Sequence, residues 1–279
     1  MKAGTLFVVA TPIGNLEDIT LRALRVLKEA DLIACEDTRQ TQKLLSHFAI
    51  EKPTVSYHEH NEAERAVELV EKLEDGANIA LVSDAGMPGI SDPGYRVVVL
   101  AVERGIKVVP IPGAVAFATA LAASGLPTDS CRFNGFLPAK SGQRREALET
   151  IATSAVTEIF YEAPHRLLDA LRDVVAVLGA ERPIVVAREL TKVHEEFVRG
   201  SAATVLAEFD QRPGEVKGEI VLLIGKGTAP VAAKVSARAR LEAIMREQKL
   251  DEKAALKVLA KEMGVSKSEV YREVQRGRK

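Results

Sequence analysis

The chain has 279 residues, of which 47% are hydrophobic, and its 38 Lys and Arg nearly balance its 39 Asp and Glu. This composition is typical of a globular protein and excludes a disordered chain, and the net charge of −1 gives no general attraction to nucleic acid or membranes. The length suits two domains of ordinary size. Cys35 and Cys131 fit neither a metal site nor a disulfide framework, which indicates a reducing compartment.

The first residues superficially resemble a signal peptide, but their apolar run spans only Leu6 to Ala10 and lacks a site typical of cleavage. It is better interpreted as a first strand. No run approaches the roughly 18 apolar residues of a membrane span. We therefore expect a cytoplasmic protein with no membrane partner.

Short apolar runs alternate with helical patterns in the first half of the chain, which favours a mostly parallel sheet with helices on both faces. The expected strands are Thr5–Ala10, Asp31–Cys35, Thr54–His58, Asn78–Ser83 and Ile106–Pro110. The expected helices are Leu21–Ala30, Gln40–Phe48, Ala63–Glu74 and Tyr95–Arg104.

The same alternation starts again in the second half, with an antiparallel pair expected where strands follow closely. The expected strands are Cys131–Phe136, Val156–Tyr161, Ile184–Leu190, Glu196–Arg199 and Glu219–Ile224. The expected helices are Arg144–Ala152, His165–Leu178 and Ala202–Asp210. We predict one α/β domain over residues 1–113 and a second over residues 114–228.

Residues 234–279 form a basic tail, with 13 Lys and Arg against 7 Asp and Glu, whereas the rest of the chain has a net charge of −7. Asp251 is placed to cap a helix that ends near Gly264, and Ser266 to cap a second one. Two short helices joined by a glycine turn resemble a helix-turn-helix. Contact with RNA and packing on the protein's own body are about equally compatible with this pattern.

Three Gly- and Pro-rich segments each follow an expected strand: ATPIGNLED, SDAGMPGISDPG and PIPGAVA. In a parallel sheet they emerge at the carboxyl edge, where open α/β folds bind ligands. Each alone could be a simple tight turn, but three at one edge favour a binding site.

The second of these segments carries the carboxylates Asp84 and Asp92 among its glycines. The chain has neither the G-x-G-x-x-G fingerprint nor the G-x-x-x-x-G-K-[ST] motif, and carboxylates oppose a bound phosphate. A cationic nucleoside fits better. S-adenosylmethionine, with an ammonium, a sulfonium and ribose hydroxyls, is such a ligand.

The motifs ATPIGNLEDIT, ACEDTR, SDAGMPGISDPG, PIPGA and FYEAPHR closely resemble the ribosomal small-subunit 2′-O-methyltransferase I family, a branch of the tetrapyrrole-methylase (class III) superfamily. The resemblance covers nearly the whole chain. It implies two α/β domains with the cofactor cleft between them, a homodimer, and transfer of methyl from S-adenosylmethionine to the ribose 2′-hydroxyl of a cytidine in the decoding region of 16S ribosomal RNA.

Carried over by motif, the resemblance implies cofactor contacts on five segments of the chain. They are Pro12, Gly14, Ser83, Asp84, Ala85, Pro88, Val115, Ala116, Tyr161, Glu162, Leu190 and Thr191.

The reaction needs a base to remove the hydroxyl proton, and the candidates for catalysis are Asp37, Arg39 and Glu162. For RNA contact the candidates are Arg39 and, on a segment expected to be a flexible loop, Lys140, Arg144 and Arg145. The low aromatic content, 4%, argues against an aromatic stacking platform, so recognition should depend on shape, phosphates and one extruded nucleotide.

Several of these polar residues also have a purely structural interpretation. Asp37 or Thr38 is well placed to cap the following helix, as are Asn61 and Asp92. His58 and His60 alternate along a strand without a further ligand, so no metal is expected. Asp84 precedes no obvious helix, which favours a role in binding.

Two other functions use the same features. One is a small-molecule methyltransferase of the tetrapyrrole type, although the G-x-G-P-G-D and G-G-D-P strings of that branch are missing here. The other is a non-catalytic factor that binds the ribosome.

Overall fold

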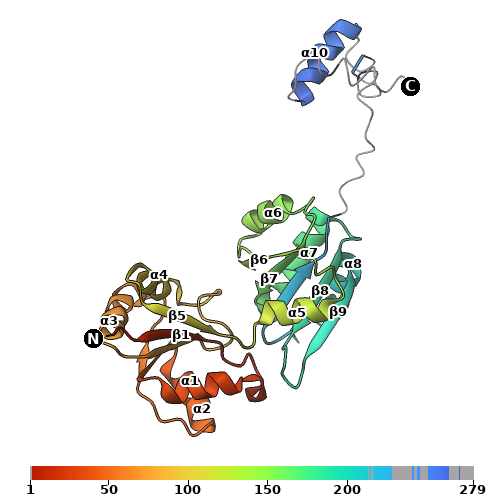
Figure 1. The fold of residues 1–279 in the computed structure, drawn as a ribbon. Helices are drawn as coiled ribbons and strands as arrows, with labels where there is room; N and C mark the ends of the chain where they lie inside the picture. Colours follow the sequence, from red (N-terminus) through yellow and green to blue (C-terminus); the bar gives the residue numbers. More distant parts are fainter. Residues whose placement is uncertain are drawn as a thin grey trace. The chain divides into compact units, whose positions relative to one another are not determined.

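The computed structural model describes residues 2–212, 214, 216–227, 241, 244, 245, 251–263 and 270. The chain divides into two compact units, Met1–Ile151 with Val156–Lys226 and Ala152–Ala155 with Gly227–Lys279. The first unit holds two five-stranded sheets with their helices (Figure 1).

The first sheet is parallel throughout, in the order β3-β2-β4-β1-β5. Its strands are β1 (Thr5–Val9), β2 (Leu32–Cys35), β3 (Thr54–Ser56), β4 (Ile79–Val82) and β5 (Lys107–Ile111). Its helices are η1 (Leu16–Asp18), α1 (Leu21–Glu29), α2 (Thr38–His47), α3 (Glu62–Glu74) and α4 (Tyr95–Glu103).

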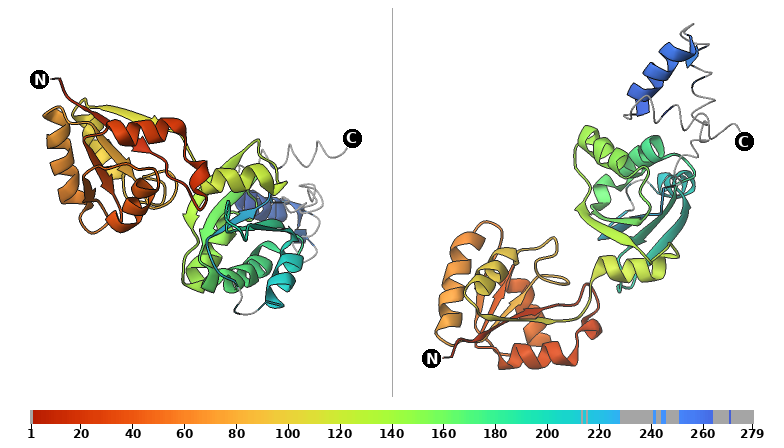
Figure 2. Two further views of the ribbon diagram at one scale, coloured as in Figure 1. Left: turned by 90° about the horizontal axis from the view of Figure 1, so that it is seen from below. Right: turned by 45° about the horizontal axis from the view of Figure 1, so that its top comes forward.

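Both faces of this sheet are covered, because alternate side chains of a strand point to opposite faces. On β4, Ile79 and Leu81 pack with apolar residues of α3 and α4, whereas Ala80 and Val82 pack with residues of α1 and α2. Figure 2 shows the two helix pairs on opposite sides of the strands. Because the strands are parallel, they all end at one edge of the sheet, and helices cover both of its faces.

The second sheet is mixed, in the order β6-β7-β10-β8-β9; β6 and β7 are parallel, and the other neighbours are antiparallel. Its strands are β6 (Cys131–Phe136), β7 (Thr157–Glu162), β8 (Pro183–Arg188), β9 (Glu196–Ser201) and β10 (Ile220–Ile224). Its helices are α5 (Ala116–Ser124), α6 (Ser141–Thr150), η2 (Pro164–Arg166), α7 (Leu167–Leu178) and α8 (Ala202–Asp210).

Helices α6, α7 and α8 share one core with this sheet, and α5 covers the other face. Ile13, from the loop after β1, is buried in the same cluster as Leu121 of α5 and Val221 of β10. The loop thus joins the first sheet to the core of the second through apolar contact.

The second unit contains α10 (Glu252–Met263), and Asp251 caps it as predicted, since its Oδ1 accepts a hydrogen bond from the Ala254 N–H at 2.7 Å. Its apolar residues form a small cluster of their own: Leu241, Ile244, Ala255, Leu256, Leu259, Ala260 and Val270. The helix expected after Ser266 lies outside the described residues.

The predicted α/β class is confirmed, and all ten predicted strands are present with ends within two residues of the expected ones. Helix α5 was not predicted, because it is small and apolar all round and gives no amphipathic stripe. The sequence held one signal for its end, Gly125, because glycine often terminates a helix. In the structure Gly125 is the C-cap of α5, in the left-handed conformation with φ of 80°. The prediction that Lys140, Arg144 and Arg145 lie on a flexible loop is wrong in part, because α6 begins at Ser141.

Candidate functional site

The loops after β1, β4 and β5 meet at the carboxyl edge of the first sheet, as predicted. Thr11 and Gly86 exchange both backbone hydrogen bonds, at 2.9 and 3.1 Å, and the Thr11 hydroxyl donates to the Ser83 carbonyl at 3.0 Å. A Cβ on Gly113 would lie 2.8 Å from the Ala10 side chain, so only glycine lets the third loop approach the first. The three loops form one rigid rim.

A pocket of about 470 Å³ opens beside this rim and is lined from both sheets, a volume within the range of small-molecule sites. Its apolar side includes Tyr161, Leu190, Ile220 and Val221. No Lys, Arg or His is among the described residues that line it. The pocket therefore combines apolar surface with acidic side chains, one of which, Glu219, is 71% exposed and pairs at 3.0 Å with Lys192 from outside the lining.

Five carboxylates also line the pocket; one is Glu162, and we call the other four, Glu36, Asp84, Asp92 and Glu219, the acidic wall. Burial and the neighbouring charges of Glu36, Asp84 and Glu219 raise the pKa of Asp92 to about 7. Burial, and then the charge of Asp84, also raise the pKa of Glu36. A group of like charges that already repel one another disfavours an anion and favours a cation.

Asp84 is held at the wall by the backbone of the neighbouring loop, because its Oδ1 accepts a hydrogen bond from the Asp37 N–H at 3.1 Å. Burial raises the pKa of Asp84, while this hydrogen bond opposes the shift. The carboxylate thus has a protein partner as well as a face toward the pocket.

Asp37 caps α2, as the structural interpretation predicted, since its Oδ1 accepts from the Arg39 N–H at 2.8 Å. Its carboxylate also pairs with the Arg39 guanidinium at 2.7 Å, and hydrogen bonds from Arg39 lower the pKa of Asp37 to about 2. Neither residue lines the pocket. A carboxylate of such low pKa is a weak proton acceptor, so the geometry does not favour Asp37 as the base.

Glu162 is the one predicted catalytic residue that lines the pocket. Its side chain is fully buried, its Oε1 accepts from the Ala163 N–H at 2.8 Å, and Arg166 pairs with the same oxygen at 3.2 Å. Its buried Oε2 has no hydrogen-bond partner within the described part of the chain. Burial raises the pKa of Glu162. A buried carboxylate oxygen without a partner suits a hydroxyl or N–H donor of a ligand.

The structure brings together seven of the twelve predicted cofactor residues at this pocket: Asp84, Ala85, Val115, Ala116, Tyr161, Glu162 and Leu190. The other five, Pro12, Gly14, Ser83, Pro88 and Thr191, do not line it.

Three of these five have other contacts that shape the site. Ser83 donates to the Gly86 carbonyl at 3.2 Å, and the Thr191 hydroxyl accepts from the Asn15 N–H at 3.1 Å. A Cβ on Gly14 would lie 2.5 Å from the Lys192 side chain. These residues fix the loops on which the pocket is built.

Asp92 corrects a prediction. It does not cap α4, whose N-cap is Gly94 without a side-chain cap. Instead Glu62 of α3 accepts hydrogen bonds from the N–H groups of Gly94 and Arg96, at 3.2 and 3.3 Å. Asp92 is left to line the pocket, and its place in the same glycine-rich loop as Asp84 was the signal for this.

Other lining residues escaped sequence reasoning altogether. Phe136 and Glu219 come from β6 and from the segment just before β10, and no motif marks them. Only the tertiary fold places them beside the loops of the first sheet.

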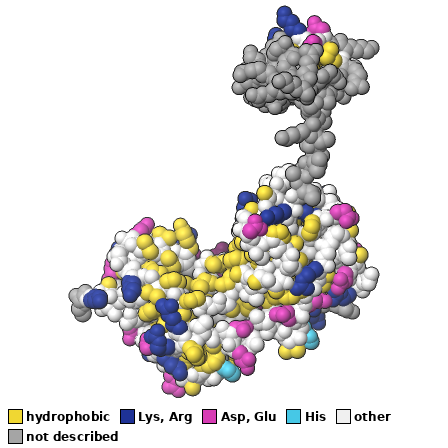
Figure 3. Space-filling model, turned by 45° about the vertical axis from the view of Figure 1, so that its right-hand side comes forward, with side chains coloured by type: hydrophobic (Ala, Val, Ile, Leu, Met, Phe, Trp, Pro, Cys, Tyr) yellow, Lys and Arg dark blue, Asp and Glu magenta, His cyan; other side chains and the backbone are white. Residues whose placement is uncertain are grey.

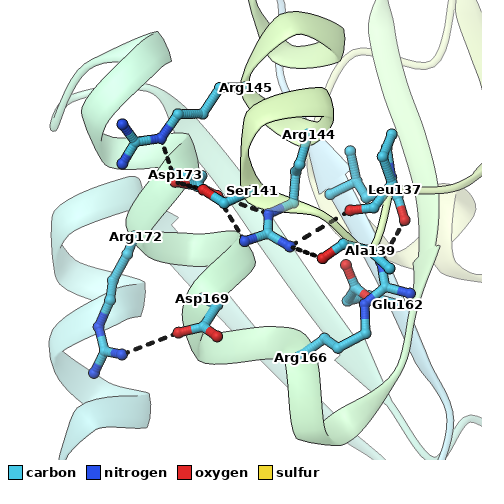
Figure 4. A network of polar contacts seen from close by, with 11 residues as sticks. Leu137, Ala139, Ser141, Arg144, Arg145, Glu162, Arg166, Asp169, Arg172 and Asp173 are labelled. Atoms are coloured by element: carbon cyan, nitrogen blue, oxygen red, sulfur yellow. Dashed lines mark hydrogen bonds and ion pairs between the residues drawn. The ribbon is translucent and has the colours of Figure 1, made fainter.

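The predicted RNA contact Arg144 is wrong on structural grounds, as Figure 4 shows. Its side chain is only 4% exposed, pairs with Asp173 of α7 at 2.6 Å and donates to the Pro138 and Ala139 carbonyls. Arg145, 54% exposed, pairs with the other oxygen of Asp173 at 2.6 Å, and Lys140 is exposed just before α6. Arg144 therefore joins α6 to α7 and is not available to RNA.

The described residues contain no group of three or more His, Cys, Asp and Glu side chains placed to hold a metal ion. Within that same part of the chain, no helix is both long and apolar enough to cross a bilayer.

Comparison with known proteins gives matches over most of the chain. A family model described as Tetrapyrrole (Corrin/Porphyrin) Methylases matches residues 5–206. The chain is 50% identical over 273 residues to the Ribosomal RNA small subunit methyltransferase I of Halalkalibacterium halodurans, covering 96% of this chain and 93% of the relative. The protein of the same name from Escherichia coli O157:H7 is 48% identical over 269 residues, covering 96% and 94%.

Solved structures with lower sequence identity show the same fold. A diphthine synthase superposes with a TM-score of 0.61 at 15% identity, covering 80% of this chain and 90% of the other. The uroporphyrin-III C-methyltransferase of Thermus thermophilus, complexed with S-adenyl homocysteine, superposes with a TM-score of 0.56 at 18% identity, covering 80% and 97%.

We predict that Arg144→Met lowers the free energy of unfolding by about 2 kcal/mol, because it leaves the buried Asp173 carboxylate with only one of its two arginine partners. Urea denaturation measures this, with Lys140→Met as the matched control, expected to change stability by less than about 0.5 kcal/mol. Equal stabilities of the two variants would contradict the structural role of Arg144.

We also predict a pH-dependent effect of Asp92→Asn. The folded-state pKa of Asp92, about 7, lies above its ordinary value of 3.8, so its contribution to stability is complete below pH 4 and is lost as the pH rises through 7. Relative to wild type, the variant should gain about 1–2 kcal/mol in free energy of unfolding between pH 4 and pH 8, a figure reduced for its remaining exposure. Urea denaturation at both pH values tests this, with the exposed Asp75→Asn as control; a pH-independent difference would refute it.

Proposed function

Because the chain belongs to the tetrapyrrole (corrin/porphyrin) methylase family and, within it, to the ribosomal RNA small subunit methyltransferase I group, we propose that it methylates 16S ribosomal RNA. The methyl donor is S-adenosylmethionine. The acceptor we propose is the ribose 2′-hydroxyl of a cytidine in the decoding region, in the small ribosomal subunit in the cytoplasm. The observation that carries the proposal is one pocket lined by both the acidic wall and an apolar surface.

The residues of the pocket fit the donor. Leu190, Ile220 and Val221 offer an apolar surface for adenine, and the acidic wall suits the ammonium and sulfonium groups. The Oε2 of Glu162, which has no hydrogen-bond partner within the described residues, is left to accept from the hydroxyl that is methylated. When bound, S-adenosylmethionine supplies a methyl group activated by the positive sulfur.

The chain's own task is to hold the acceptor hydroxyl in line with that methyl group, to exclude water and to take up the hydroxyl proton. Asp37, Arg39 and Glu162 were the predicted catalytic residues. Of these we retain Glu162 as the candidate acceptor of the proton, because it alone lines the pocket and burial raises its pKa.

For RNA contact we retain Arg39 and Lys140, both exposed, together with Arg145 and the basic tail of residues 234–279. Arg39 follows Glu36 of the acidic wall by three residues, so it can meet a phosphate beside the pocket. The domain limits 1–113, 114–228 and 234–279 are kept in this proposal.

We also keep the homodimer in this proposal. Hydrophobic side chains gather on one face of the first unit (Figure 3). Leu21 and Val193 are 86% and 95% exposed, as an interface between two copies would require.

The direct test is to incubate the protein with methyl-labelled S-adenosylmethionine and small subunits from cells that lack this modification, and to map the label. We expect one labelled cytidine, modified on its ribose. A label on a base, or none on RNA, would refute the proposal, and transfer to a porphyrin instead would favour the small-molecule alternative.

We further predict that Asp84→Asn separates the cationic donor from its neutral product. The amide oxygen can still accept from the Asp37 N–H, so the loop keeps its shape while one negative charge is lost. Calorimetry at pH 8 should show S-adenosylmethionine binding about tenfold more weakly and S-adenosylhomocysteine changed by less than about twofold. Asp75→Asn is the control. Equal losses for both ligands would contradict a contact of Asp84 with the sulfonium, because only the donor carries that charge while both ligands carry the ammonium.

A further inference from the structure

Phe136 is a large apolar side chain left at the surface of the pocket. It lies at the end of β6, lines the pocket, and is 55% exposed. The apolar residues deeper in the pocket are very different, since Leu190, Ile220 and Val221 are 5%, 3% and 3% exposed. An aromatic ring exposed at the rim of a ligand pocket is available to a second ligand.

The backbone around Phe136 fixes this exposure. The pairing of β6 with β7 shifts register between Phe133 and Phe136, and Gly135 within the shift has φ of 69°, a conformation that favours glycine. Asn134 before the bulge donates to the buried Glu158 at 2.7 Å, and Leu137 after it is buried. Arg166 donates to the Leu137 carbonyl, as Figure 4 shows. With both sides anchored, the bulge holds Phe136 outward.

The ring is also supported from within. Phe136 meets Tyr161 edge-on at 5.6 Å between ring centres, Tyr161 meets Phe133 at 4.8 Å, and Phe133 stacks on Phe117 at 4.5 Å. Such contacts fix the orientation of a ring without covering its outer face. Phe136 is thus the exposed end of a series of four packed aromatic rings.

The bulge that carries Phe136 lies next to the loop after β4, which holds Asp84 and Asp92. A Cβ on Gly135 would lie 3.8 Å from the Ser91 hydroxyl oxygen, and Ser91 precedes Asp92 of the acidic wall. A nucleotide at the rim therefore meets an aromatic ring from the second sheet and polar groups from the first.

We propose that Phe136 is the stacking surface for the base of the nucleotide that is methylated. This inference rests on the proposed function, because a ribose can enter the pocket only if its nucleotide leaves the stack of its neighbours. Stacking on an aromatic side chain replaces the lost neighbours and contributes about 1–3 kcal/mol per base. The adenine of the cofactor would instead be held by the buried apolar residues Leu190, Ile220 and Val221. One ring serves one extruded base, so a low aromatic content is no obstacle.

The test uses Phe136→Ala, Phe136→Leu and Phe136→Trp, with Tyr95→Leu as the matched control, because Tyr95 is 72% exposed and does not line the pocket. Three experiments are done on each variant. Calorimetry gives the Kd of S-adenosylhomocysteine, and filter retention with that ligand present gives the Kd of unmodified small subunits. Steady-state kinetics gives KM and kcat of methyl transfer to those subunits.

We expect Phe136→Ala to raise the Kd and KM for small subunits about tenfold while the Kd of S-adenosylhomocysteine changes less than about twofold. Phe136→Trp should keep the wild-type values, Phe136→Leu should not, and the control Tyr95→Leu should match wild type. A weaker Kd for S-adenosylhomocysteine would overturn the proposal, because the ring would then contact the cofactor. So would full activity of the leucine variant, or an unchanged KM in Phe136→Ala while wild type methylates normally. If wild type fails to label small subunits, the proposed function itself fails.

Discussion

Five carboxylates, Glu162 and the four of the acidic wall, line one pocket, and no basic side chain is among the described residues that line it. Their mutual repulsion is the constraint on which the site depends. Two features reduce this repulsion: the pKa of Asp92 is raised to about 7, and Asp84 accepts a hydrogen bond from the backbone of the neighbouring loop. What remains is a negative field at the pocket, which a cationic nucleoside would neutralise and a phosphorylated one would intensify.

The fold holds this arrangement against its own repulsion. Because the first sheet is parallel, its loops meet at one edge, and the Thr11–Gly86 hydrogen bonds lock two of them together. Ile13 then anchors the first loop in the core that α5 forms with the second sheet. The acid-bearing loop is therefore tied to the edge at which the second sheet presents Tyr161, Glu162 and Phe136.

Much of this site could be predicted from the sequence because it depends on local order. Asp84 and Val115 follow strands of a parallel sheet, so their edge was known once the strands were recognised. Asp92 was misread because Asp-Pro before a helix is also a capping pattern, and only the structure shows that Glu62 of another helix takes that role. Arg144 was misread because nothing in its basic segment shows that its side chain is buried in a pair with Asp173, 29 residues further along the chain. Phe136 and Glu219 depend on how the second sheet meets the first, which no local pattern encodes.

The central claim is that charge selects the ligand, and calorimetry of the wild-type protein with S-adenosylmethionine and with ATP at pH 8 tests it most directly. Both ligands carry adenosine, and they differ in the group at its 5′ carbon, which is a cationic sulfonium with a methionine chain in one and an anionic triphosphate in the other. We expect a clear binding isotherm for S-adenosylmethionine and none for ATP at the same concentrations. Binding of ATP as tight as that of S-adenosylmethionine would contradict the account.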